Sequence, residues 1–82
     1  MARALSIVDA DVTDPEGVVH QHLVVTTKRQ TFLARQGRGR TAQTVVLEEN
    51  VAGVRYISQQ RWAVDTAHGT YLIFDRGCGC TG

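Results

Sequence analysis

Hydrophobic and polar residues alternate along most of this chain with a period of two. The clearest run is 18–27, in which Val19, Leu23 and Val25 are expected on one face and His20 and His22 on the other. Such alternation is typical of β-strands, because successive side chains of a strand point to opposite faces of the sheet. The same pattern predicts further strands over 3–9, 31–35, 42–48, 54–58, 62–66 and 71–75.

Turn signals separate these strands. Asp-Pro-Glu-Gly at 14–17 is a strong type I turn signal, because proline presets φ at the second position and glycine tolerates the exit. Thr-Ala-His-Gly at 66–69 predicts the turn of a hairpin, with Gly69 as the residue of positive φ. Gln-Gly-Arg-Gly-Arg at 36–40 contains no residue to bury and predicts a flexible hairpin loop.

One stretch is ambiguous between helix and strand. Hydrophobic residues recur at helical spacing between Leu47 and Ile57, but Gly53 and the β-branched content argue against a long helix. We therefore expect a single helical turn near 48–52, followed by the strand at 54–58.

Six to seven short strands at roughly ten-residue spacing are typical of a small antiparallel barrel or sandwich. We predict an all-β domain over 1–76, followed by a flexible Gly/Cys tail over 77–82. The chain has 82 residues, too few for a multidomain enzyme or a dinucleotide-binding scaffold.

Composition supports a globular domain of marginal stability. The chain is 43% hydrophobic and 21% charged, which is ordinary for a folded protein and too apolar for a disordered one. Small domains often gain stability from disulfides, metals or partners. A bond between Cys78 and Cys80 would close only a small, strained ring, so self-association is the route that we expect.

The sequence also indicates a location. No run approaches 18 apolar residues, so no membrane-spanning helix is expected. The apolar run that follows Arg3 ends at the charged residue Asp9, so it is too short for the apolar part of a secretory signal. We expect the protein in the cytoplasm, or in an assembly built there.

The near-neutral net charge of +1 hides an uneven distribution. Residues 1–27 carry a net charge of −3, residues 28–40 one of +5, and residues 41–82 one of −1. Arginine binds phosphate through bidentate hydrogen bonds, and glycine amides in a loop add donors. The central segment is therefore the candidate anion-binding site, although a solvated loop is the simpler interpretation. Its residues are Lys28, Arg29, Arg35, Gly37, Arg38, Gly39 and Arg40.

A metal site has weaker support. His20 and His22 are two residues apart, so on a regular strand both imidazoles would point to one face, as two zinc ligands can. Cys78 and Cys80 would complete a set of four if the tail folded back. This spacing matches no known zinc module, and an exposed polar strand face is the simpler interpretation, so we predict no metal and no cofactor.

Enzymatic signatures are missing from the sequence, which contains no phosphate-binding loop, nucleophile elbow or meaningfully spaced carboxylate pair. Asp65 and His68 share one predicted hairpin, but a turn with an aspartate cap explains them more simply. We do not expect an enzyme.

Two functions fit these observations. The first is a non-catalytic binding module that self-associates and contacts an anionic ligand through residues 28–40, the ligand being a nucleotide, a nucleic acid or an acidic protein face. The alternative is a structural protein that forms rings or decorates a larger particle such as a phage virion. In that case the basic loop would meet the acidic segment 9–16 of a neighbouring subunit, and the C-terminal tail would also make subunit contacts.

Overall fold

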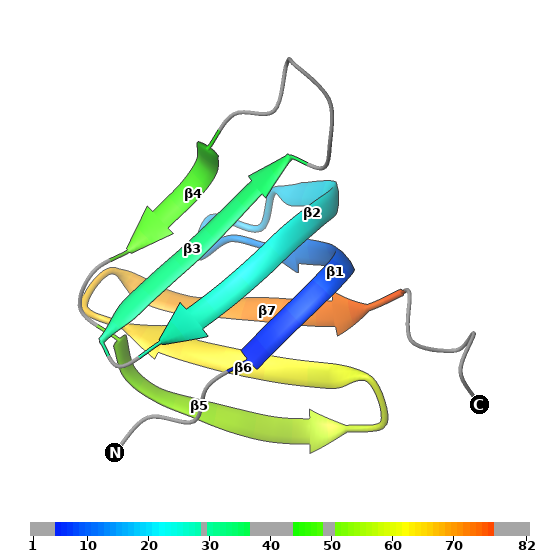
Figure 1. The fold of residues 1–82 in the computed structure, drawn as a ribbon. Coiled ribbons are helices and arrows are strands. Elements are labelled where there is room, and N and C mark those ends of the chain that lie inside the picture. Colours follow the sequence, from blue (N-terminus) through cyan, green and yellow to red (C-terminus); the bar gives the residue numbers. More distant parts are fainter. Residues whose placement is uncertain (1–4, 29, 37–43, 49–50, 77–82) are drawn as a thin grey trace.

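Seven antiparallel strands and no helix make up the described part of the chain (Figure 1). The computed structural model describes residues 5–28, 30–36, 44–48 and 51–76. The strands are β1 (Leu5–Thr13), β2 (Val19–Lys28), β3 (Thr31–Gln36), β4 (Thr44–Glu48), β5 (Val51–Ser58), β6 (Arg61–Thr66) and β7 (Gly69–Asp75). They form one sheet in the order β4-β3-β2-β1-β7-β6-β5, which confirms the all-β antiparallel prediction.

The sheet curls upon itself without closing into a barrel. The end strands β4 and β5 each pair with one neighbour only in the described residues. Even so, the ring of Phe32 on β3 lies 5.1 Å from that of Tyr71 on β7, although β2 and β1 separate these strands in the sheet order. Figure 1 shows β2, β3 and β4 crossing the layer formed by β5, β6 and β7, with β1 leading from one to the other.

The core fills the inside of this curl. Among the side chains that the structure describes, it consists of aliphatic and aromatic residues from β1, β2, β3, β5, β6 and β7, and burying them supplies the main driving force for folding. They are Leu5, Ile7, Ala10, Val12, Leu23, Val25, Phe32, Ala34, Val51, Val64, Tyr71 and Ile73. The one buried polar residue of the described chain, Thr27, accepts a hydrogen bond from the backbone N–H of Leu5 over 2.8 Å. Its hydroxyl is thus satisfied inside the sheet.

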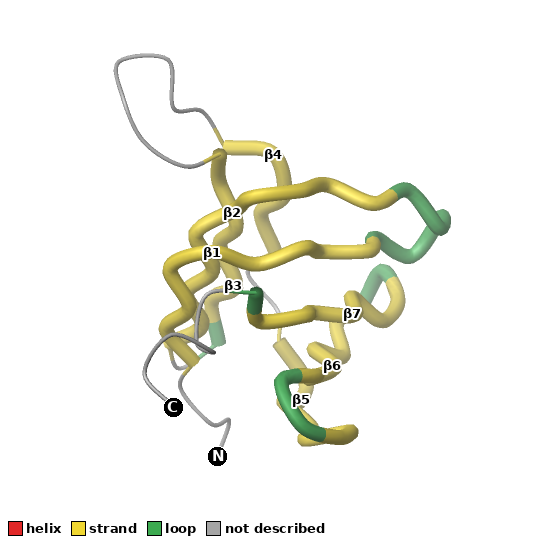
Figure 2. The backbone as a smooth tube through the Cα atoms, turned by 90° about the vertical axis from the view of Figure 1, so that its right-hand side faces the viewer, coloured by secondary structure: helices red, strands yellow, loops and turns green. Residues whose placement is uncertain are grey.

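The turns predicted at 14–17 and 66–69 are confirmed, while most of the predicted loop at 36–40 lies outside the described residues. The N–H of Gly17 donates to the carbonyl of Asp14 over 2.9 Å, and Gly17 has a φ of +92°. The β6–β7 hairpin turns over Ala67 and His68, and Gly69 leaves it with a φ of +133°. The two turns lie at the same end of the molecule (Figure 2) and touch there, since a Cβ on Gly69 would come within 2.8 Å of the Pro15 side chain.

The helical turn expected near 48–52 is wrong at the residues that the structure describes. Glu48 ends β4, and Val51 and Ala52 begin β5. The N–H of Val51 donates over 3.3 Å to the carbonyl of Gln30, in the β2–β3 connection. This contact across the curl favours extended backbone over the weak helical stripe, as tertiary contacts often override local propensity.

Two β-bulges interrupt the pairing of β1 with β2, and they change which residues face the core. Between Ile7 and Ala10 the extra residue is on β1, and between Ala10 and Val12 it is on β2. The second bulge falls at Gln21 and His22, and His22 has a φ of +62°. An extra residue reverses the alternation of side chains beyond it.

Val19 is therefore turned outward. It pairs with Thr13 and is 54% exposed, whereas Leu23 and Val25 are buried. The expectation that these three residues share one face is wrong, because it assumed an unbroken period of two.

Candidate functional site

The predicted anion-binding segment begins on an exposed hairpin. Lys28 ends β2 opposite Thr31, and Arg35 lies on β3 opposite Val24. Directly opposed residues of antiparallel strands share a face, and the alternating neighbours Thr27 and Ala34 are buried. Lys28 and Arg35 therefore lie on the same outer face of the hairpin, where both are exposed.

The two cations are well separated along the strand. Four residue steps along β2 separate their positions, which corresponds to about 13 Å along a strand. Successive charged groups of an extended polyanion can contact both side chains. Neither side chain has a carboxylate partner within the described residues.

The rest of the segment belongs to parts of the chain that the structure does not describe. These residues are Arg29, Gly37, Arg38, Gly39 and Arg40, as are the tail cysteines Cys78 and Cys80.

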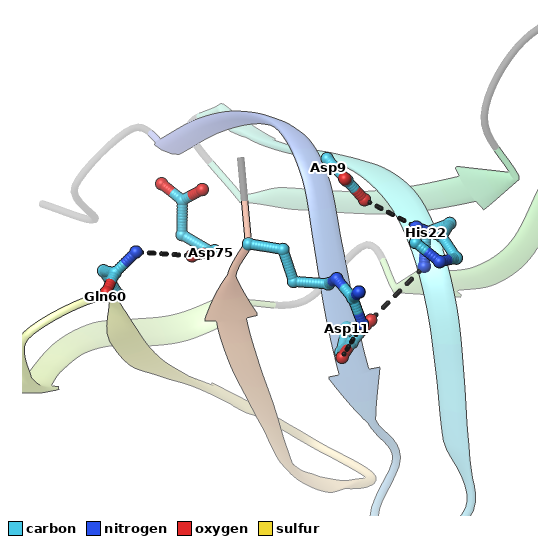
Figure 3. Close-up of polar contacts among 6 residues, drawn as sticks. Asp9, Asp11, His22, Gln60 and Asp75 are labelled. Carbon is cyan, nitrogen blue, oxygen red and sulfur yellow. Dashed lines mark hydrogen bonds and ion pairs between the residues drawn. The ribbon is translucent and has the colours of Figure 1, made fainter. Parts of the chain in front are cut away.

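The two histidines of β2 bind different carboxylates. His20 Nε2 lies 3.1 Å from Asp14 Oδ2, and His22 Nδ1 lies 3.1 Å from Asp9 Oδ1 (Figure 3). The bulge at His22 breaks the regular strand on which their side-by-side placement depended. Among the described residues no group of three or more histidine, cysteine, aspartate or glutamate side chains could hold a metal ion.

The aspartates of the acidic N-terminal segment have partners within the chain. Asp11 accepts a hydrogen bond from Arg76 Nη1 over 3.1 Å and, more weakly, from the N–H of His22 over 3.4 Å (Figure 3). Asp9 and Asp14 hold the two histidines. Each of these aspartates would have to exchange its partner to contact a neighbour, and the sequence pattern alone did not reveal these pairings.

Asp14 also organises the β1–β2 turn. Its Oδ1 accepts hydrogen bonds from the N–H groups of Glu16 and Val18, over 2.9 and 3.0 Å. The hydrogen bond from His20 and these backbone donors hold the pKa of Asp14 below its ordinary value.

The suggested acid–base pair of Asp65 and His68 has a different explanation in the structure. Arg55 donates two hydrogen bonds to the Asp65 carboxylate, over 2.7 and 3.0 Å, and Thr70 donates a third over 2.9 Å. The bond from Arg55 is the main cause of the lowered pKa of Asp65. A carboxylate held ionised by a bidentate arginine is a poor proton acceptor at neutral pH.

An open groove of about 410 Å³ crosses the outer face of β7 and its neighbours. Most of its lining is apolar, with Asp11, Thr13 and Arg61 as the polar members. The lining residues are Asp11, Thr13, Val19, Ile57, Arg61, Trp62, Leu72, Ile73 and Phe74. Sequence reasoning missed this groove, because the alternation assigned Val19 to the face of Leu23 and Val25.

The Arg61 guanidinium covers one side of the groove. Its Cζ lies 4.9 Å from the centroid of the Phe74 ring, a cation–π distance. No carboxylate pairs with Arg61 in the described part of the chain. The groove thus combines exposed hydrophobic side chains with the charged Arg61.

A membrane-spanning helix is not found in the described part of the chain. No protein-family model matches the sequence, and neither the curated proteins nor the solved structures include one with significant similarity to this chain.

Proposed function

We propose that this protein is a non-catalytic β-sheet module that self-associates and contacts an anionic ligand through residues 28–40. The observation that carries the proposal is the outer face of the β2–β3 hairpin, where Lys28 and Arg35 are exposed without a carboxylate partner in the described residues. The described carboxylates of 9–14, by contrast, are paired inside the chain.

The positions of Lys28 and Arg35 suit a ligand with several charges. Positions about 13 Å apart along a strand allow the two side chains to contact separate charges of one ligand. A nucleic acid or an acidic protein face presents such a series of charges, and a nucleic acid presents them at close, regular intervals. Arg38 and Arg40 follow Arg35 closely in the sequence.

Retention on a phosphate-bearing polyanion resin tests the ligand. We expect Lys28→Ala/Arg35→Ala to elute at lower salt than the wild type, and Arg38→Ala/Arg40→Ala to elute earlier as well. The slope of log binding constant against log salt should fall by roughly one for each phosphate that the variant no longer neutralises.

Arg55→Ala is the matched control for a single substitution of Arg35, because both remove one arginine charge and Arg55 lies on β5, outside residues 28–40. Equal loss of retention in Arg35→Ala and Arg55→Ala would mean that only net charge matters. Unchanged retention of both double variants would contradict the proposed anion site.

A second candidate is a subunit of a larger assembly. The open sheet favours it, since β4 and β5 each have one unpaired edge in the described residues, and such edges pair readily with other chains. Contact between a neighbour's basic loop and residues 9–16 has less support, because Asp9, Asp11 and Asp14 would have to leave their partners.

Native mass spectrometry separates the two candidates. A small, closed oligomer that carries an anionic ligand supports the binding module. Large rings or open-ended series without ligand support the assembly subunit. A strict monomer at all concentrations would contradict self-association in both.

A further inference from the structure

Exposed hydroxyl groups accompany the two cations on the outer face of β1, β2 and β3. Thr31 is paired with Lys28, and Thr26, two residues before Lys28, is paired with Ser6 on β1. All three hydroxyl side chains are exposed, and none forms a hydrogen bond within the described part of the chain. Serine and threonine hydroxyls donate hydrogen bonds to phosphate oxygens, as cationic side chains do. The face therefore offers more donors to an anion than its two charges alone.

Charged and uncharged donors alternate along the hairpin. Lys28, Thr26 and Val24 are successive outward positions of β2, and Arg35 on β3 lies opposite Val24. Two residue steps along a strand correspond to about 7 Å. A cation, a hydroxyl and a second cation thus follow one another at regular intervals. A chain of anionic groups lying across this face can accept hydrogen bonds from each of them in turn.

Hydrophobic side chains are sparse on this face. Val24 and Leu33 are half-buried between the donors, and Val8 is exposed where β1 bulges at the border of the face. The other exposed large hydrophobic side chains of the described residues lie in or beside the β1–β2 turn and on β5 and β7. They are Val18, Val19, Tyr56, Ile57 and Leu72. Because nucleic-acid interfaces are more polar and more positively charged than protein interfaces, this face suits a nucleic acid better than an acidic protein.

Asp9 is a carboxylate that borders the face. It belongs to the β1 bulge opposite Val24, and its Oδ1 lies 3.1 Å from His22 Nδ1 (Figure 3). Its position is two strands away from that of Arg35, which corresponds to about 10 Å across a sheet. The positive face therefore ends at the β1 bulge, and an anionic ligand should lie over β2 and β3.

Aromatic side chains are absent from this face. The sequence has one tryptophan, two tyrosines and two phenylalanines, and the structure describes all of them. Phe32 is buried in the core, and the others belong to β5, β6 and β7. Proteins that bind single strands without sequence preference stack the bases on aromatic side chains. A duplex needs no such platform, because its bases are stacked inside and its phosphates present one charge per about 1.7 Å of helix axis.

We propose that the outer face formed by Ser6, Thr26, Lys28, Thr31 and Arg35 binds the phosphate backbone of double-stranded nucleic acid without reading its base sequence. The inference rests on the proposed function and names one ligand for the same site. It also extends the site from the basic segment to the hydroxyls of β1 and β2. Binding is independent of sequence because contacts to phosphate carry no direct information about the bases.

Thr26→Val tests the contribution of the hydroxyls. Valine keeps the shape and the strand preference of threonine but donates no hydrogen bond. We expect the affinity for a fluorescently labelled DNA duplex, measured by anisotropy, to fall by about fivefold, the effect of one hydrogen bond. The salt dependence of binding should not change, because no charge is lost. Lys28→Ala/Arg35→Ala should instead lower the slope of log affinity against log salt by about two.

Thr13→Val is the matched control. Thr13 lies on the second half of β1, opposite Leu72 of β7, so the substitution removes a hydroxyl outside the proposed face. It should leave the affinity for the duplex unchanged. Far-UV circular dichroism and thermal unfolding show whether each variant remains folded. Equal affinities of Thr26→Val and the wild type would overturn the role of the hydroxyls.

Competing ligands test the class of the partner. Duplexes of unrelated sequence should displace the labelled duplex equally well, and a single strand of the same length or polyglutamate should displace it less well. A strong preference for one duplex sequence would overturn binding without base reading. A single strand that competes better than the duplex would overturn the choice of a duplex. Polyglutamate that competes as well as DNA would indicate an acidic protein face and overturn the inference.

Two results separate failure of this inference from failure of the proposed function. If polyglutamate binds as tightly as DNA and Lys28→Ala/Arg35→Ala weakens both, the anion site stands and the inference about the duplex falls. If the wild type binds neither polymer at low salt, the inference and the proposed anion site fall together.

Discussion

Gly17 and Gly69 both have positive φ, but a side chain would meet different surroundings at each. A Cβ on Gly69 would lie 2.8 Å from Pro15, whereas one on Gly17 would meet nothing within 4 Å. The free energy of unfolding of Gly17→Ala should therefore be about 1 kcal/mol below that of the wild type, because only the unfavourable backbone conformation contributes. The free energy of unfolding of Gly69→Ala should fall further, by about 2–3 kcal/mol, because the two turns must also move apart.

Gly53→Ala is the reference for these two variants, because Gly53 has ordinary φ and open space around its Cα. Alanine there should be neutral or stabilise the fold by up to about 1 kcal/mol. Urea unfolding measures all three free energies. Equal losses in Gly17→Ala and Gly69→Ala would contradict the predicted close approach of the turns.

His22 is strained in its backbone while its side chain makes only an exposed contact. Its φ of +62° favours glycine, and its imidazole pairs with Asp9 at the surface, where ion pairs contribute little. His22→Gly should therefore keep or raise stability, and His22→Ala should be about 1 kcal/mol less stable than His22→Gly. The two variants, compared by urea unfolding, both remove the imidazole and differ only in the backbone contribution.

At the scale of the elements, local chemistry predicted the turns well and the bulges not at all. Proline and glycine at 14–17, and glycine after 66–68, act within their own few residues, so they are visible in the sequence. The bulge at His22 is different, because its backbone N–H and its ring contact Asp11 and Asp9 on another strand. A period-two pattern contains no information about cross-strand partners, so it assigned Val19 to the wrong face.

The curl of the sheet depends on contacts between strands that are not neighbours. Phe32 is fully buried on β3 and meets Tyr71 on β7, so it joins the two layers. Phe32→Ala should destabilise the fold by about 3–5 kcal/mol, enough to leave much of a small domain unfolded. Phe74→Ala is the control, because Phe74 is only half-buried and should cost distinctly less. Similar losses in the two variants by urea unfolding would contradict a core centred on Phe32.

At the scale of the whole molecule, the charges of the sequence segments predicted the exposed basic face but not the pairing of the acidic residues. The basic centre of the sequence does place Lys28 and Arg35 on one exposed face. The acidic arm is not the free counterpart that its charge of −3 indicates, because Arg76, 65 residues further along the chain, pairs with Asp11. Long-range pairing of this kind depends on the β1–β7 register and cannot be deduced from segment charges.

Acid should weaken the whole fold through two carboxylates whose pKa values are lowered in the folded chain. The hydrogen bond from His20 lowers the pKa of Asp14, and those from Arg55 lower the pKa of Asp65, relative to the ordinary 3.8. Below that value the unfolded chain binds protons that the folded chain does not, so the free energy of unfolding decreases as the pH falls. The contributions of both carboxylates are fully present above about pH 4 and disappear as the pH falls through the folded pKa values.

Thermal unfolding between about pH 2 and 7 measures this effect and assigns it. The wild-type Tm should fall steeply below about pH 4. In Asp65→Asn, which cannot ionise at this position, Tm near neutral pH should be lower but its decline towards acid pH should be shallower. Asp14→Asn should behave similarly, since it removes the other lowered carboxyl. An acid decline as steep in both variants as in the wild type would mean that other carboxylates control acid unfolding, and that the ion pairs at the turn and on β5–β6 do not.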